Sequence, residues 1–116
     1  MEDSESGIPV ETPPGAVKAW LDAGEAVALI DVREPFEHTL ARIEGCELMP
    51  MNTVPACLEQ LQQTAAGKLL VVYCHHGVRS LNVVSWLRAH GVANCTSMAG
   101  GIEAWSLEVD RKVGRY

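Results

Sequence analysis

The chain has 116 residues and a hydrophobic fraction of 47%, which suits one globular domain with its own core. Its formal net charge is −6 and it has no cluster of lysine and arginine, so nucleic-acid binding is not expected. No apolar run approaches the length needed to span a membrane, and the acidic segment 1–5 lacks the layout of a signal peptide. We therefore expect a cytoplasmic protein without a membrane partner.

The N-terminal part of the chain is polar and acidic before the first regular pattern begins. Residues 1–11 show no periodicity, and we expect them to form a flexible lead-in to a domain over residues 12–116. Thr12 is followed by two prolines, which is typical of a helix N-cap and first turn. Apolar residues at helical spacing then predict a helix over 14–23.

Short apolar runs alternate with helical patterns along the rest of the domain. The expected strands are the runs at 26–32, 46–49, 68–73 and 94–98. The expected further helices lie at 37–41, 55–66, 80–90 and from 102 onward. This alternation favours an α/β fold with a mainly parallel sheet and helices on both faces. Cys74, Asp31 and the pair Gly100-Gly101 all follow strands, so we expect them at the edge where such sheets bind ligands.

The four cysteines are Cys46, Cys57, Cys74 and Cys95, and none of them forms a C-x-x-C pair. No histidine pair has zinc-finger spacing, so we expect free thiols, no metal site and no cofactor. Apart from Cys74, these residues are interpreted as small core or near-surface fillers.

Cys74 stands where a buried strand ends and a helix begins. The apolar run ends at Tyr73, Gly77 permits a turn with positive φ, and helical spacing starts at Ser80. The unpaired amide groups of a helix start favour a thiolate and bind anions. We therefore predict that Cys74 is a nucleophilic thiolate held in an anion-binding loop.

Charged side chains surround this predicted nucleophile. Arg79 is expected to bind an anionic group of a substrate, and an ion pair with a carboxylate at a helix start is the alternative. His75 and His76 raise the positive potential of the loop when protonated, and solvent exposure without a specific task is the alternative. Asp31 and Arg33 are interpreted as an internal ion pair or hydrogen-bond network that holds the loops, rather than as catalytic groups.

The span from Cys74 to Arg79 is six residues, and its amide groups would form a cradle for negative charge if they pointed inward. Two chemistries fit such a cradle. In sulfur transfer, Cys74 accepts a sulfur atom, forms an anionic persulfide and passes the sulfur to a second nucleophile. In phosphate-ester hydrolysis, a phosphocysteine forms instead, which needs a wider cradle and a proton donor for the leaving group.

Three motifs occur in a fixed order along the chain. They are D-V-R-E-P-F-E at 31–37, C-H-H-G-V-R-S at 74–80 and G-G-I-E-A-W at 100–105. Together they resemble the motifs of single-domain rhodaneses, which are modules of the thiosulfate sulfurtransferase type, and the resemblance covers about residues 12–105. One departure is R-I-E-G-C at 42–46, where H-I-x-G-A is commoner, and it concerns residues that mainly shape the fold.

The resemblance implies a rhodanese-like three-layer fold with a mainly parallel, five-stranded sheet. It also implies a persulfide at Cys74 and support of the loop by Ser80. The implied active-site loop that binds the substrate consists of His75, His76, Gly77, Val78 and Arg79. The loop length favours sulfur transfer, because related cell-cycle phosphatases have one more residue between Cys and Arg. Those phosphatases also usually have His at the position of Tyr73.

The implied reaction moves sulfane sulfur from thiosulfate or a persulfide donor to cyanide, a thiol or a protein. Two alternatives come from other readings of the same loop. One is a phosphatase or arsenate reductase that uses the same thiolate. The other is a non-catalytic or redox-sensing rhodanese module that binds a partner.

Overall fold

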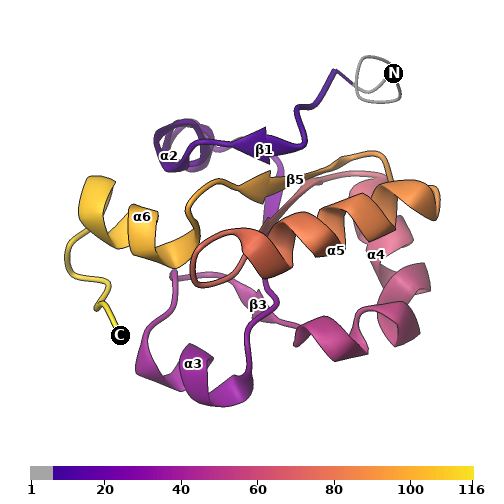
Figure 1. Cartoon of the computed structure of the whole chain (residues 1–116). Coiled ribbons are helices and arrows are strands. Elements are labelled where there is room, and N and C mark those ends of the chain that lie inside the picture. The colour runs from indigo at the N-terminus through magenta and orange to yellow at the C-terminus, as the bar shows by residue number, and fades with distance from the viewer. Residues whose placement is uncertain (1–6) are drawn as a thin grey trace.

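The computed structural model describes residues 7–116, which form a five-stranded sheet with helices on both faces (Figure 1). The strand order is β1-β5-β4-β2-β3, and every neighbouring pair is parallel. The strands are β1 (Glu11–Thr12), β2 (Val27–Asp31), β3 (Glu47–Leu48), β4 (Leu69–Tyr73) and β5 (Cys95–Met98). The helices are α2 (Pro14–Asp22), α3 (Pro35–Leu40), α4 (Leu58–Ala65), α5 (Val78–Ala89) and α6 (Gly101–Glu108), with short 3-10 turns η1 (Met51–Thr53) and η2 (Pro55–Cys57). The predicted α/β architecture is confirmed.

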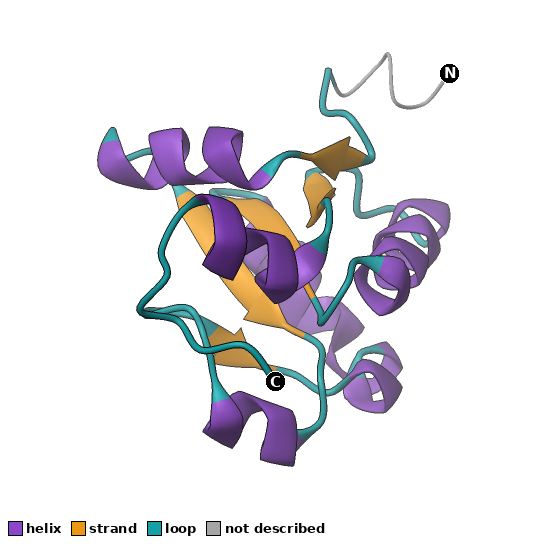
Figure 2. Cartoon of the chain, turned by 60° about the vertical axis from the view of Figure 1, so that its left-hand side comes forward, coloured by secondary structure: helices purple, strands orange, loops and turns teal. Residues whose placement is uncertain are grey.

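Successive residues of the central strand β4 face opposite layers of the core. Val72 packs in a cluster with Leu61 of α4 and Val84 of α5. Val71 points to the other face and packs in a cluster with Trp105 of α6. Figure 2 shows the sheet between these two helix layers. The sequence of β4 is a continuous apolar run because its side chains point to the two faces in turn and both faces are buried.

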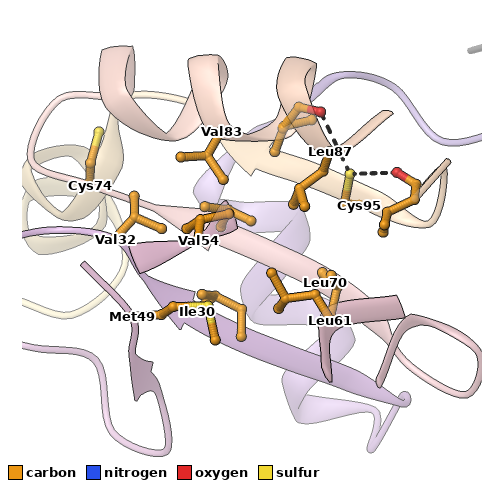
Figure 3. Packing of buried hydrophobic residues seen from close by; sticks show 13 residues of the cluster. Ile30, Val32, Met49, Val54, Leu61, Leu70, Cys74, Val83, Leu87 and Cys95 are labelled. Atoms are coloured by element: carbon orange, nitrogen blue, oxygen red, sulfur yellow. Dashed lines mark hydrogen bonds between the residues drawn. The ribbon is translucent and has the colours of Figure 1, made fainter. Parts of the chain in front are cut away.

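The first cluster extends from the carboxyl edge of the sheet to its opposite end. Figure 3 shows Cys74 at one end of this cluster and Cys95 at the other. The Cys95 thiol is buried and donates a weak hydrogen bond to the carbonyl of Val92 at 3.3 Å. Cys57 packs against the same cluster, and all four cysteines are free thiols. Cys57 and Cys95 are therefore fillers, as predicted.

Thr12 does not cap α2, so this prediction is wrong. Thr12 belongs to β1, which pairs with β5, and its hydroxyl group shares a buried hydrogen bond with Thr96 Oγ1 at 2.8 Å. Pro13 takes the N-cap position without a side-chain hydrogen bond. A two-residue strand is too short to produce a hydrophobic period, and its Thr-Pro-Pro sequence is also a typical helix start.

The segment predicted as a lead-in, 1–11, is described from residue 7 onward, and its residues 1–6 lie outside the described part. The carbonyl of Val10 accepts a hydrogen bond from Ser97 N at 2.8 Å. The guanidinium group of Arg88 donates to the carbonyl of Ile8 at 2.8 Å. Contacts with the domain therefore begin before residue 12.

Two predicted helices start earlier in the structure than the sequence pattern indicates. α3 begins at Pro35, because proline is well tolerated in a first helical turn, and Glu34 N donates to Glu37 Oε1 at 3.0 Å. α5 begins at Val78, directly after Gly77. Within residues 7–116, no helix has both the length and the apolar character that crossing a bilayer requires.

Candidate active site

The segments that follow β4 and β5 meet at the carboxyl edge of the sheet, as predicted. Ile102 N donates to the carbonyl of Cys74 at 2.9 Å, and Glu103 N donates to the carbonyl of His75 at 3.1 Å. Gly101 has φ of +63°, and a Cβ atom there would lie 2.5 Å from the Cys74 carbonyl oxygen. Only glycine fits this position, because the backbone of α6 approaches the Cys74 loop closely there.

The sulfur of Cys74 lies inside the loop, with 1% of the residue exposed. Its Sγ atom accepts hydrogen bonds from Gly77 N at 3.1 Å and from Ser80 N at 3.3 Å. The thiol lies 3.4 Å from Ser80 Oγ, and Ser80 Oγ shares a hydrogen bond with Ser97 Oγ at 2.8 Å. Gly77 adopts φ of +102°, which turns its amide toward the sulfur. Backbone N–H groups converging on one atom form a cradle suited to an anion.

Arg79 closes the loop through a bidentate ion pair with Glu37 of α3. Its Nη1 lies 2.7 Å from Glu37 Oε1, and its Nη2 lies 2.9 Å from Glu37 Oε2. The hydrogen bonds from Arg79 lower the pKa of Glu37 to about 2, although burial opposes this shift. The Arg79 side chain therefore forms an ion pair with a carboxylate near a helix start, which was the alternative to the expected binding of a substrate anion.

Asp31 and Arg33 form the expected internal ion pair, and both side chains are fully buried. Arg33 Nε donates to Asp31 Oδ1 at 2.8 Å, and Arg33 Nη2 donates to Asp31 Oδ2 at 2.7 Å. His38 Nδ1 lies 3.0 Å from the same carboxylate. Burial alone would raise the pKa of Asp31, but the hydrogen bonds from Arg33 and His38 outweigh it and lower the pKa below its usual value.

His75 and His76 lie side by side on the outer surface of the loop. Their rings stack with centroids 3.9 Å apart, His75 half-buried and His76 exposed. Burial, with a smaller contribution from the charge on His76, lowers the pKa of His75. The surroundings of His75 therefore favour its neutral form. Val78, also on the loop, is 69% exposed.

Comparison with known protein families matches residues 13–108 of the chain to the rhodanese-like domain. The chain belongs to this family. The matched residues include the Cys74 loop, the Asp31–Arg33 pair, the Glu37–Arg79 pair and Gly101.

Relatives of this rhodanese-like domain include proteins that carry sulfurtransferase in their names. The probable adenylyltransferase/sulfurtransferase MoeZ of Mycobacterium tuberculosis is 32% identical over 103 residues, which is 89% of this chain and 26% of that protein. The adenylyltransferase and sulfurtransferase MOCS3-2 of Zea mays is 34% identical over 97 residues, which is 80% of this chain and 20% of that protein. The chain therefore spans about a quarter or less of these relatives.

Solved structures of similar proteins have the same fold. The rhodanese-like domain protein from Staphylococcus aureus superposes with a TM-score of 0.77 at 27% identity. The superposition covers 93% of this chain and 99% of that protein, so here the likeness extends over nearly the whole of both.

Tyr116 lies outside the residues matched to the rhodanese-like family, yet it contacts the site. Its hydroxyl group accepts a hydrogen bond from Arg33 Nη1 at 2.8 Å and donates one to Glu37 Oε2 at 2.8 Å. Its ring stacks on His75 with centroids 4.0 Å apart. In both Figure 1 and Figure 2 the C-terminal end lies near α3. Sequence reasoning missed Tyr116, because no periodicity or motif in the tail marks it.

Tyr73, which precedes Cys74, is not part of the cradle around Sγ. Its side chain belongs to the opposite face of the sheet from Cys74. The Tyr73 hydroxyl donates to Cys46 Sγ at 3.2 Å and accepts from Ile43 N at 3.2 Å, and burial raises its pKa. The unusual R-I-E-G-C segment thus supplies partners for a buried phenol, which agrees with its predicted role in shaping the fold.

Proposed function

We propose that this rhodanese-like domain is a sulfurtransferase that carries sulfane sulfur on Cys74. The observation that supports this most is the cradle around Sγ, with Gly77 N at 3.1 Å and Ser80 N at 3.3 Å. Amide donors at this distance stabilise negative charge on a sulfur atom held there. The donor in this proposal is thiosulfate or a persulfide, and the acceptor is cyanide, a thiol or a protein. The proposed setting is the cytoplasm, where the four thiols stay reduced.

The proposed reaction has two displacement steps on sulfur. The Cys74 thiolate attacks the outer sulfur of thiosulfate, the S–S bond of thiosulfate breaks, and sulfite leaves with the bonding electron pair. This step gives a Cys74 persulfide, whose terminal sulfur carries the negative charge. An acceptor nucleophile then attacks that terminal sulfur, and the Cys74 thiolate leaves with the electron pair. With cyanide the product is thiocyanate, and no external oxidant or reductant is consumed.

The groups around the loop favour this chemistry over phosphate-ester hydrolysis. A phosphatase of this kind needs a guanidinium group for the phosphoryl oxygens, and both terminal nitrogens of Arg79 are bound to Glu37. It also needs a protonated group for the leaving oxygen, whereas Glu37, with a pKa of about 2, is ionised at neutral pH. Sulfur transfer requires neither group.

Mass spectrometry of the intact chain after incubation with thiosulfate tests the proposal directly. We expect a gain of one sulfur atom that is lost in Cys74→Ser and kept in Cys57→Ser, the matched control at a thiol outside the loop. The same pair of variants is then assayed for thiosulfate:cyanide transfer. Transfer that persists in Cys74→Ser would refute the proposal.

Two further outcomes distinguish the alternatives. Hydrolysis of an aryl phosphate that depends on Cys74 would identify a phosphatase. Absence of both the sulfur adduct and any turnover would identify a module that binds a partner or senses redox state.

A further inference from the structure

Three side chains with metal-binding atoms meet on the surface beside the Cys74 loop. One ligand atom from each of His75, His76 and Glu103 lies within 4.8 Å of the other two. The histidines come from the loop after β4, and Glu103 comes from the first turn of α6. We propose that His75, His76 and Glu103 form a binding site for a divalent transition-metal ion of the zinc class.

Backbone hydrogen bonds fix the position of Glu103 relative to the loop that carries His75 and His76. Glu103 N donates to the carbonyl of His75 at 3.1 Å, so the first turn of α6 is tied to the loop at the ligand residue itself. The fit depends on Gly101, because a Cβ atom there would lie 2.5 Å from the Cys74 carbonyl oxygen. A site built on rigid backbone loses little conformational freedom when it binds an ion.

The His75 ring is held between two other rings, whereas the His76 ring is exposed to solvent. His75 lies between the rings of His76 and Tyr116, with centroid distances of 3.9 Å and 4.0 Å. The planes of the two histidine rings differ by 22°. A zinc ion lies near the plane of each imidazole ring that binds it, whereas the two stacked rings are nearly parallel. The His76 ring must therefore turn out of the stack to bind the same ion as His75. His76 is exposed and has room for this movement.

The carboxylate of Glu103 has a competing partner. Arg115 Nε lies 3.0 Å from Glu103 Oε2, and Arg115 Nη2 also contacts this oxygen. The Arg115 side chain is 59% exposed, and ion pairs of such exposed groups contribute little free energy. A doubly charged ion therefore displaces the guanidinium group at modest cost. This competition predicts that removing Arg115 strengthens metal binding.

The donor set selects the class of ion. Two imidazole nitrogens and one carboxylate oxygen suit Zn²⁺ and similar ions, whereas Mg²⁺ and Ca²⁺ prefer sites made of oxygen atoms. Three protein ligands leave at least one coordination position open. Sequence spacing did not reveal this site, because adjacent histidines with a distant glutamate match no zinc motif.

Isothermal titration of the full chain with Zn²⁺ tests this proposal, with Cys74→Ser as the background so that this thiol does not bind the ion. We expect one site, and we expect His76→Ala and Glu103→Gln each to weaken it about tenfold or more. Arg115→Ala is expected to bind more tightly than the background. His90→Ala is the matched control, because His90 stacks on Trp86, away from the loop, and its loss leaves the affinity unchanged.

Circular dichroism of each variant verifies that it is folded. Equal zinc affinity in the background, His76→Ala and Glu103→Gln would overturn the proposal, and so would the absence of zinc binding in the background. Weaker binding in Arg115→Ala would also overturn the proposal, because loss of the competing guanidinium group should free Glu103 for the ion. Tighter binding in this variant is a result that a merely loosened fold would not give. The titration measures metal binding alone, so its result is independent of whether the domain transfers sulfur.

Discussion

The Tyr116 hydroxyl group donates a hydrogen bond to Glu37 Oε2 at 2.8 Å. The same oxygen of Tyr116 accepts a hydrogen bond from Arg33 Nη1 at 2.8 Å. One phenol therefore joins the Asp31–Arg33 ion pair after β2 to the Glu37–Arg79 ion pair that closes the Cys74 loop. The tail supplies a group that holds two otherwise separate parts of the site together.

Replacing Tyr116 by Phe is expected to lower the free energy of unfolding by about 1–2 kcal/mol. The substitution removes two hydrogen bonds to charged groups and leaves Arg33 Nη1 without that partner in a buried position. Denaturation in urea measures the change. Tyr116→Ala, which also removes the stacking on His75, should cost more. A Phe variant as stable as the original chain would show that the phenol does not contribute to this network.

Breaking the buried ion pair is expected to be more costly. Asp31→Asn leaves the guanidinium group of Arg33 buried without a full countercharge, which costs about 3–5 kcal/mol. The control is Asp22→Asn, which removes the exposed pair with Lys18 and costs about 0.5 kcal/mol or less. Both values come from denaturant unfolding. A cost for Asp31→Asn no larger than that of the control would contradict the structural role of this pair.

The Glu37–Arg79 pair predicts how stability depends on pH. The pKa of Glu37 is about 2 in the folded chain, against an ordinary value of 4.5. Because the folded state holds the proton less tightly, the pair contributes its full stability above about pH 5. That contribution falls progressively as the pH drops through 4.5 toward 2. Unfolding curves between pH 2 and 6 should therefore show a smaller pH dependence in Glu37→Gln, and an unchanged pH profile would contradict this prediction.

Gly101 is expected to tolerate no side chain. Gly101→Ala places a methyl group 2.5 Å from the Cys74 carbonyl oxygen at φ of +63°. The collision and the left-handed backbone together should cost about 2–5 kcal/mol. Gly91→Ala is the matched control, because Gly91 has φ of +90° with open space around it, so only the backbone strain of about 1–2 kcal/mol applies. Equal costs for the two variants would mean that the loop yields easily at Gly101.

Much of the scaffold was predictable because its signals are local. The run 69–73, the glycine turn and the helical spacing after it predicted β4, the Cys74 loop and α5 without reference to distant residues. Their alternation with other runs predicted the parallel sheet, and hence the edge where three motifs meet. β1 was missed, because two residues carry no period and their partner, β5, lies at the other end of the chain.

By itself the sequence determined the order of the helices and of the strands other than β1, and the place of Cys74 at the end of β4. Only the tertiary structure decided which side chains surround the Cys74 loop. The pairing of Arg79 with Glu37, the bridge made by Tyr116 and the meeting of His75 with Glu103 join residues that are far apart along the chain. Hydrophobic period and turn chemistry act over a few residues. These contacts arise only once the parallel strands bring their carboxyl ends to one edge.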